Sequence, residues 1–171
     1  MQAIIFLTHI ETEPIYQHFT RIKAETRGLL DVYLAVHDCV GEVTRLSFPA
    51  DFRVPADGVW QDKLFVRYAE KKARGGTFLP GFADLIYMPI MLGPELAGYA
   101  SIWVLEYDVD FAGPWDAFFR PLVSSQADLI GTTFYRKEQC PGWAFWAGLV
   151  TPAQVACENY IRGFLVVGSF K

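Results

Sequence analysis

The sequence is poor in cysteine and has no surplus of basic residues. Its three cysteines, Cys39, Cys140 and Cys157, form no CxxC pair. This pattern argues against a disulfide framework or a zinc site and fits a reducing cytoplasm. Lys and Arg number 15 against 19 Asp and Glu, which gives a net charge of -4. A nucleic-acid-binding protein usually shows the opposite balance, so we expect no nucleic-acid partner.

Long apolar runs are also lacking. No stretch approaches the roughly 18 residues of a transmembrane helix, so we expect no membrane span. The first residues, MQAIIFLTHIETEP, have no basic segment, and acidic residues follow the apolar run at once. A signal peptide has the opposite pattern, so we expect a cytoplasmic protein. The sequence also lacks GxGxxG, Walker A, GxSxG and HExxH motifs, which mark common nucleotide, hydrolase and zinc-protease sites.

Hydrophobic residues, in contrast, are abundant. They make up 52% of the 171 residues, aromatics make up 16%, and the mean hydropathy is +0.19. This length and composition predict one domain, residues 1–171, with a substantial core. They also predict apolar surface that needs a cover. The run at residues 164–170 reads as an unprotected edge strand, and we expect a homodimer in which a second copy covers it.

The first forty residues predict a strand, a helix and a second strand. Gln2–Thr8 and Asp31–Asp38 are short apolar runs typical of buried strands. Thr12 and Pro14 are typical of a helix start, and apolar residues then recur at spacings of three and four until Gly28. A helix between two strands favours parallel pairing.

The rest of the chain continues this alternation. Residues 40–60 contain several helix and strand breakers and are expected to be irregular. We expect helices over residues 62–74, in part of 81–98, from Pro114 to Val123 and from Thr151 to Arg162, and strands over 101–109, 128–135 and 164–170. This order predicts an α/β fold, a three-layer α/β/α sandwich around a mainly parallel or mixed sheet.

An acidic cluster follows the strongest predicted strand. Because side chains alternate along a strand, Glu106, Asp108 and Asp110 are expected to point the same way. Three neighbouring carboxylates repel one another, and a divalent cation such as Mg²⁺ or Mn²⁺ removes that repulsion. Ligands of open α/β sheets bind beyond the carboxyl ends of the strands, where this cluster falls. The alternative is that the two aspartates are turn and cap residues.

Polar residues also follow the first two strands. Thr8 and His9 end the first strand, and His37 and Asp38 end the second. The carboxyl ends of parallel strands share one edge of a sheet. Asp38 is therefore placed to accept a hydrogen bond from a ribose hydroxyl or a base N–H. The alternative is a local loop role for Asp38, and we favour structural roles for both histidines.

Residues 98–115, GYASIWVLEYDVDFAGPW, resemble the metal-binding segment of nucleotide-sugar glycosyltransferases of the type A fold. They are most similar to a little-studied glycosyltransferase-like group in which a strand ends in Glu-x-Asp-Val-x-Phe. The resemblance implies a nucleotide-diphospho-sugar transferase-like fold and metal-dependent glycosyl transfer to an acceptor that the sequence does not identify. It implies that Asp108 and Asp110 hold Mn²⁺ or Mg²⁺ against the donor diphosphate. It also implies that Thr8, His9, Asp38 and Asp108 contact the nucleotide-sugar donor.

Two alternatives to glycosyl transfer remain at this point. Enzymes of this fold usually continue past this length and supply a later metal-ligating histidine, whereas no histidine follows His37. A domain that lacks part of the acceptor-binding half, and binds nucleotide sugars without turnover, is the first alternative. The second is a haloacid-dehalogenase-like phosphatase, which also uses a strand ending in Asp-x-Asp. That motif normally lies near the start of the domain and continues with Thr, where this chain has Ala112.

Overall fold

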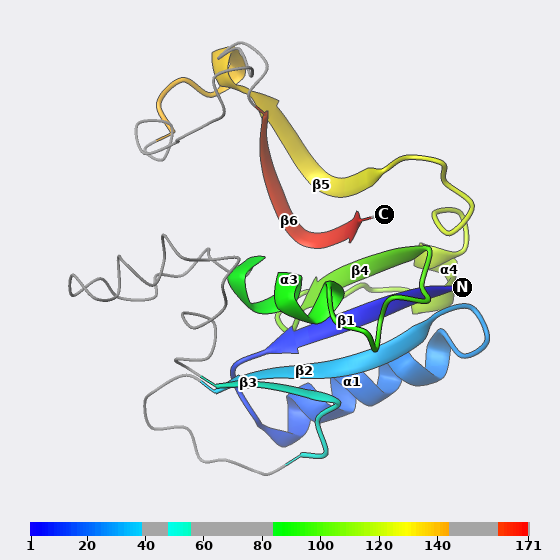
Figure 1. Ribbon diagram of the computed structural model, residues 1–171. Coiled ribbons are helices and arrows are strands. Elements are labelled where there is room, and N and C mark those ends of the chain that lie inside the picture. Colours follow the sequence, from blue (N-terminus) through cyan, green and yellow to red (C-terminus); the bar gives the residue numbers. More distant parts are fainter. Residues whose placement is uncertain (39–47, 56–83, 144–160, 171) are drawn as a thin grey trace.

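The computed structural model describes residues 1–38, 48–55, 84–143 and 161–170 (Figure 1). Its elements in chain order are β1 (Gln2–Thr8), α1 (Glu13–Glu25), β2 (Asp31–Asp38), β3 (Phe52–Pro55), α3 (Asp84–Met91), β4 (Ser101–Glu106), α4 (Trp115–Phe119), β5 (Leu129–Arg136), a 3-10 turn (Lys137–Gln139) and β6 (Ile161–Phe170). The helix predicted over residues 62–74 and most of the one predicted from Thr151 lie outside the described residues.

The strand–helix–strand unit predicted for the first forty residues is confirmed. β1 and β2 pair in parallel, with Thr8 beside Val36. Thr12 is the N-cap of α1, and Pro14 lies in its first turn. Gly28 follows the helix with a φ of 80°, a backbone conformation that side chains with a Cβ rarely adopt. The chain can therefore reverse sharply and enter β2.

The described strands form one six-stranded sheet in the order β3-β2-β1-β4-β6-β5. The first four in that order are mutually parallel, and β6 and β5 continue the sheet in antiparallel fashion. The fold is therefore α/β with a mostly parallel sheet, as predicted. The prediction that residues 164–170 form an edge strand is wrong, because β6 lies between β4 and β5. An apolar run marks a buried strand but does not say which strands flank it.

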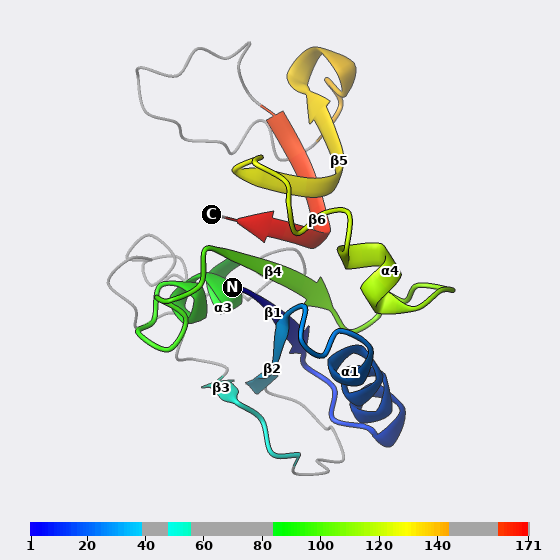
Figure 2. The same ribbon diagram turned by 90° about the vertical axis from the view of Figure 1, so that its right-hand side faces the viewer.

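Helices pack on both faces of the sheet (Figure 2). On one face, α1 and α4 bury Phe19, Ile22, Trp115 and Phe119 against alternate residues of β1, β2 and β4. On the other face, Ile86, Tyr87 and Ile90 of α3 pack against Ile5, Leu7, Ala35 and Val104. Each fully buried large apolar side chain contributes about 1.5–3 kcal/mol. Among the described residues, no helix is long and apolar enough to cross a membrane.

Two elements differ from the sequence-based expectation. The strand predicted over residues 101–109 ends at Glu106, where a hydrogen bond from Val109 N to the Glu106 carbonyl, 3.1 Å long, closes a turn. β3, within a segment expected to be irregular, is a short strand that pairs with the end of β2. Pro89 lies inside α3 and does not end it.

Candidate functional site

Three parallel strands place the predicted site residues at one edge of the sheet. Leu7 of β1 lies beside Glu106 of β4, and Thr8 lies beside Val36 of β2. The arrowheads of β1, β2 and β4 therefore point to the same side, the left of Figure 1. We call this side, where β1 to β4 end, the carboxyl edge. It is where open α/β sheets bind their ligands.

Thr8 and His9 differ in their surroundings. Thr8 is buried, and its Oγ1 donates to the Ile10 carbonyl at 2.7 Å and accepts from Ile10 N at 3.0 Å. Its hydroxyl therefore shapes the turn after β1. His9 is exposed, and its ring meets that of Tyr107 edge to face, with the ring centroids 5.0 Å apart. This contact connects the end of β1 to the residue that follows β4.

Asp38 belongs to an ion-pair cluster that the sequence did not reveal. Arg53 of β3 donates to Glu11 twice, from Nη2 at 2.7 Å and from Nη1 at 3.1 Å. Its Nη1 also lies 3.4 Å from Asp38 Oδ1. The Glu11 side chain is 4% exposed, against 34% for Arg53 and 24% for Asp38. Hydrogen bonding to Glu11, then the nearby negative charges, raise the pKa of Arg53. A permanent cation is thus fixed beside the predicted nucleoside contact.

His37, the residue before Asp38 in β2, is buried. Burial, then the neighbouring His9, lower the pKa of His37, and the charge of Asp38 opposes that shift. The neutral imidazole is therefore favoured. The parallel pairing of β1 with β2 places the ends of these two strands side by side.

Glu106 and Asp108 form an acidic pair at the end of β4. Burial, followed by the charge of Asp108, raises the pKa of the half-buried Glu106 carboxyl. Asp108 is exposed and makes no hydrogen bond or ion pair with the rest of the described chain. Asp108 is therefore an open carboxylate next to a second one.

Asp110 does not point the same way as Glu106, so that expectation is wrong. The chain turns after Glu106, and Asp110 lies against α1. Its Oδ1 accepts from Arg21 Nη1 at 3.0 Å and from Phe111 N at 2.7 Å. The Phe111 N–H, then His18 and Arg21, lower the pKa of Asp110. All these contacts involve Oδ1, and the Asp110 side chain is 65% exposed.

The same arginine holds the segment after β4 against α1. Arg21 Nη2 donates to the carbonyls of Phe111 and Gly113, at 3.1 and 3.0 Å. Glu25 accepts from Trp115 N at 2.8 Å, and His18 Nε2 donates to the Val109 carbonyl at 2.9 Å. Together with the contact between Arg21 and Asp110, these bonds tie the segment to α1 at five residues along its length. Asp110 has a structural role here, in accordance with the turn-residue alternative.

The acidic residues fit a cation that arrives with a phosphate better than one held by protein alone. The described residues contain no group of three or more His, Cys, Asp or Glu side chains able to hold a metal ion. Mg²⁺, however, commonly binds one or two carboxylates together with substrate phosphates and water. Asp108, with Glu106 beside it, meets that smaller requirement.

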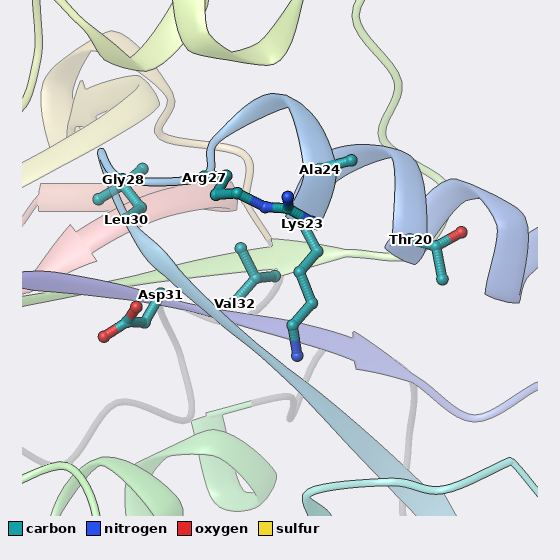
Figure 3. A pocket seen from close by; sticks show the side chains of 8 residues that line it. All are labelled: Thr20, Lys23, Ala24, Arg27, Gly28, Leu30, Asp31 and Val32. Carbon is teal, nitrogen blue, oxygen red and sulfur yellow. The ribbon is translucent and has the colours of Figure 1, made fainter.

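A pocket of about 310 Å³ lies at the opposite end of β2 (Figure 3). Lys23 of α1 and Arg27, in the turn after α1, line it together with Asp31 and Val32, the first residues of β2. It contains none of the predicted site residues. The pocket therefore lies at the end of β2 away from the carboxyl edge, where the predicted site residues converge.

Comparison with known proteins adds no relative. No family model matches the chain, and no curated protein matches its sequence. The functional argument therefore rests on the geometry of the carboxyl edge and on the resemblance of residues 98–115.

Proposed function

We propose that this chain binds a nucleotide-sugar donor at the carboxyl edge and transfers its sugar in a metal-dependent reaction. The observation that supports the proposal is the convergence of Asp38, His9 and Asp108 from the ends of three adjacent parallel strands. Helices on both faces of the sheet support the finer proposal of a three-layer sandwich like that of nucleotide-diphospho-sugar transferases. The acceptor is not identified by any described residue.

The nucleoside is proposed to lie over the ends of β1 and β2. Arg53 is anchored on the buried Glu11 and orients Oδ1 of Asp38. Asp38 then accepts from a ribose hydroxyl or a base N–H, while the exposed His9 ring and its neighbour Tyr107 provide an aromatic surface for the base. Thr8 supports this arrangement by shaping the turn beneath it.

The diphosphate is proposed to lie beside Asp108. A bound Mn²⁺ or Mg²⁺ would neutralise the charge of the leaving diphosphate. Asp108 offers an open carboxylate, and Glu106 adds a second negative charge next to it. Asp110 remains the proposed second ligand through Oδ2, the oxygen that takes no part in its contacts with Arg21 and Phe111.

Calorimetry with Mn²⁺ and a set of nucleoside diphosphates tests the proposed site. We expect Mn²⁺ to bind measurably only when a nucleoside diphosphate is present, and Asp108→Asn to abolish that joint binding. Asp116→Asn is a matched control, because Asp116 is a surface carboxylate of α4 paired with Arg120. An Asp108→Asn protein that binds both ligands like the wild type would remove Asp108 from the site.

Product analysis separates the proposed function from its two alternatives. Incubation with labelled nucleotide sugars and Mn²⁺ should release or transfer the sugar. Binding without product would support a non-catalytic nucleotide-sugar-binding domain. Release of inorganic phosphate from a phosphate monoester, abolished by Asp108→Asn, would support the phosphatase, because Asp108 would then be the nucleophile.

A further inference from the structure

β5 is the outermost strand of the described sheet. It pairs with β6 on one side, and the two strands extend away from the parallel strands in both views (Figures 1 and 2). Side chains on both of its faces are exposed, among them Leu129 at 44% and Phe134 at 42%. A strand of this kind offers both a backbone edge and apolar side chains to a partner.

Residues 129–135 of β5 lack two features that commonly protect an edge strand. Residues 129–135, LIGTTFY, contain no charged residue and no proline. The pairing of β5 with β6 is irregular between Gly131 and Thr133, but the extra residues lie in β6. There, residues 165–167 stand opposite the single residue Thr132. The irregularity therefore lies on the inner side of β5, away from its outer edge.

The sequence of β5 is complementary to itself about Thr132. In an antiparallel pair of two identical strands centred there, Asp128 of one copy lies opposite Arg136 of the other, on both sides of the two-fold axis. Leu129 lies opposite Tyr135, and Ile130 opposite Phe134. Aliphatic–aromatic and opposite-charge pairs are the cross-strand pairs that stabilise a sheet.

We propose that β5 pairs with β5 of a second copy, antiparallel and centred on Thr132, so that two sheets become one. Asp128 and Arg136 are both exposed, and neither forms an ion pair with another described residue. A shift of register moves Asp128 away from Arg136, so the charges select this register as well as the partner. This interface lies at the opposite side of the sheet from β2 and β3 and is independent of the proposed function.

Disulfide trapping tests the register. At the two-fold axis the Thr132 Cα atoms of the two copies are about 4.5–5.5 Å apart, within the range that a disulfide spans. Under mild oxidation, Thr132→Cys should therefore form a covalent dimer, with the linked peptide identified by mass spectrometry. Thr133→Cys is the matched control, because its two copies are diagonal neighbours about 7–8 Å apart, too far for a disulfide. Equal trapping at both positions, or at neither, overturns the proposed register.

Charge reversal tests whether the partner strand is β5 of a second copy, without introducing a cysteine. Asp128→Lys and Arg136→Glu each place like charges opposite one another twice, which should weaken self-association roughly tenfold in sedimentation velocity. A mixture of the two variants restores opposite charges and should form a mixed dimer, and the double variant should dimerise like the wild type. A wild type that is monomeric across the dilution series, or charge variants that associate as the wild type does, would overturn the proposal.

Discussion

Arg53 Nη2 lies 2.7 Å from Glu11 Oε2, and the carboxylate it meets is almost fully buried. The pair joins β3 to the segment that follows β1, across 42 positions of the sequence. Arg53 also reaches Asp38, so one guanidinium holds two carboxylates at the carboxyl edge. This cluster fixes the side chain that we propose as the nucleoside contact.

Removing Arg53 should destabilise the protein. In Arg53→Ala the buried Glu11 carboxylate loses its two hydrogen bonds from the guanidinium and keeps the 3.3 Å hydrogen bond from Phe48 N, so a buried negative charge loses its countercharge, which is costly. Because Arg53 is one-third exposed and water can partly replace it, we expect a loss of about 2 kcal/mol in the free energy of unfolding, below the range for fully buried pairs. Urea unfolding at neutral pH measures this loss.

A surface pair provides the control for Arg53. Arg120→Ala removes an exposed ion pair within one turn, with Asp116, and should leave the unfolding midpoint almost unchanged. Equal destabilisation by the two substitutions would show that the burial of Glu11 carries no special cost.

Removing Arg21 should loosen the segment after β4 and leave the sheet intact. Arg21→Ala takes away the donors to Phe111, Gly113 and Asp110. Hydrogen exchange should then become faster in residues 109–115 and stay the same in β1 and β2. If exchange in this segment is unaltered, the remaining contacts of His18 and Glu25 are sufficient to hold it.

The backbone of the first half was predictable because its signals are local. β1 and β2 are single apolar runs with polar ends, and Thr12, Pro14 and Gly28 mark the bounds of α1. β3 was missed because it has only four residues and ends in a proline, and it is held by pairing with β2.

The candidate site was predictable only where strand order alone determines it. Thr8 and Asp38 end parallel strands, and His9 and Asp108 come just after such strands, so all four lie at the carboxyl edge. Asp110 was misplaced because the strand was expected to continue past Glu106, whereas a turn ends it. The Glu11–Arg53 pair has no sequence signal, because isolated charges this far apart meet only through tertiary structure.

The buried His37 should make stability fall with decreasing pH. Its folded-state pKa lies below the ordinary histidine value of about 6.5, so the unfolded chain binds the proton more readily. The neutral ring contributes fully to the free energy of unfolding above the ordinary pKa of about 6.5. This contribution is lost as pH falls from about 6.5 toward the folded-state pKa. Urea unfolding between pH 7.5 and 5 should show this decline as a pH dependence that His37→Gln reduces. An NMR titration that finds His37 protonating at or above the ordinary value would contradict it.

Asp38 should contribute to nucleoside affinity but not to metal affinity. It is the last residue of β2, while the proposed metal ligand Asp108 follows β4, and β1 lies between these two strands. Losing one charge-assisted hydrogen bond costs about 1.5–3 kcal/mol, so Asp38→Ala should weaken nucleoside diphosphate binding roughly ten- to a hundredfold. With the nucleotide saturating, the affinity for Mn²⁺ should stay as in the wild type.

The Asp38→Asn variant distinguishes a direct contact of Asp38 with the nucleoside from an indirect effect through Arg53. It keeps an acceptor oxygen but removes the charge that meets Arg53, so it should retain part of the affinity if Asp38 contacts the nucleoside directly. Calorimetry that finds unchanged nucleotide affinity in Asp38→Ala would exclude Asp38 from the donor site and leave it as a partner of Arg53.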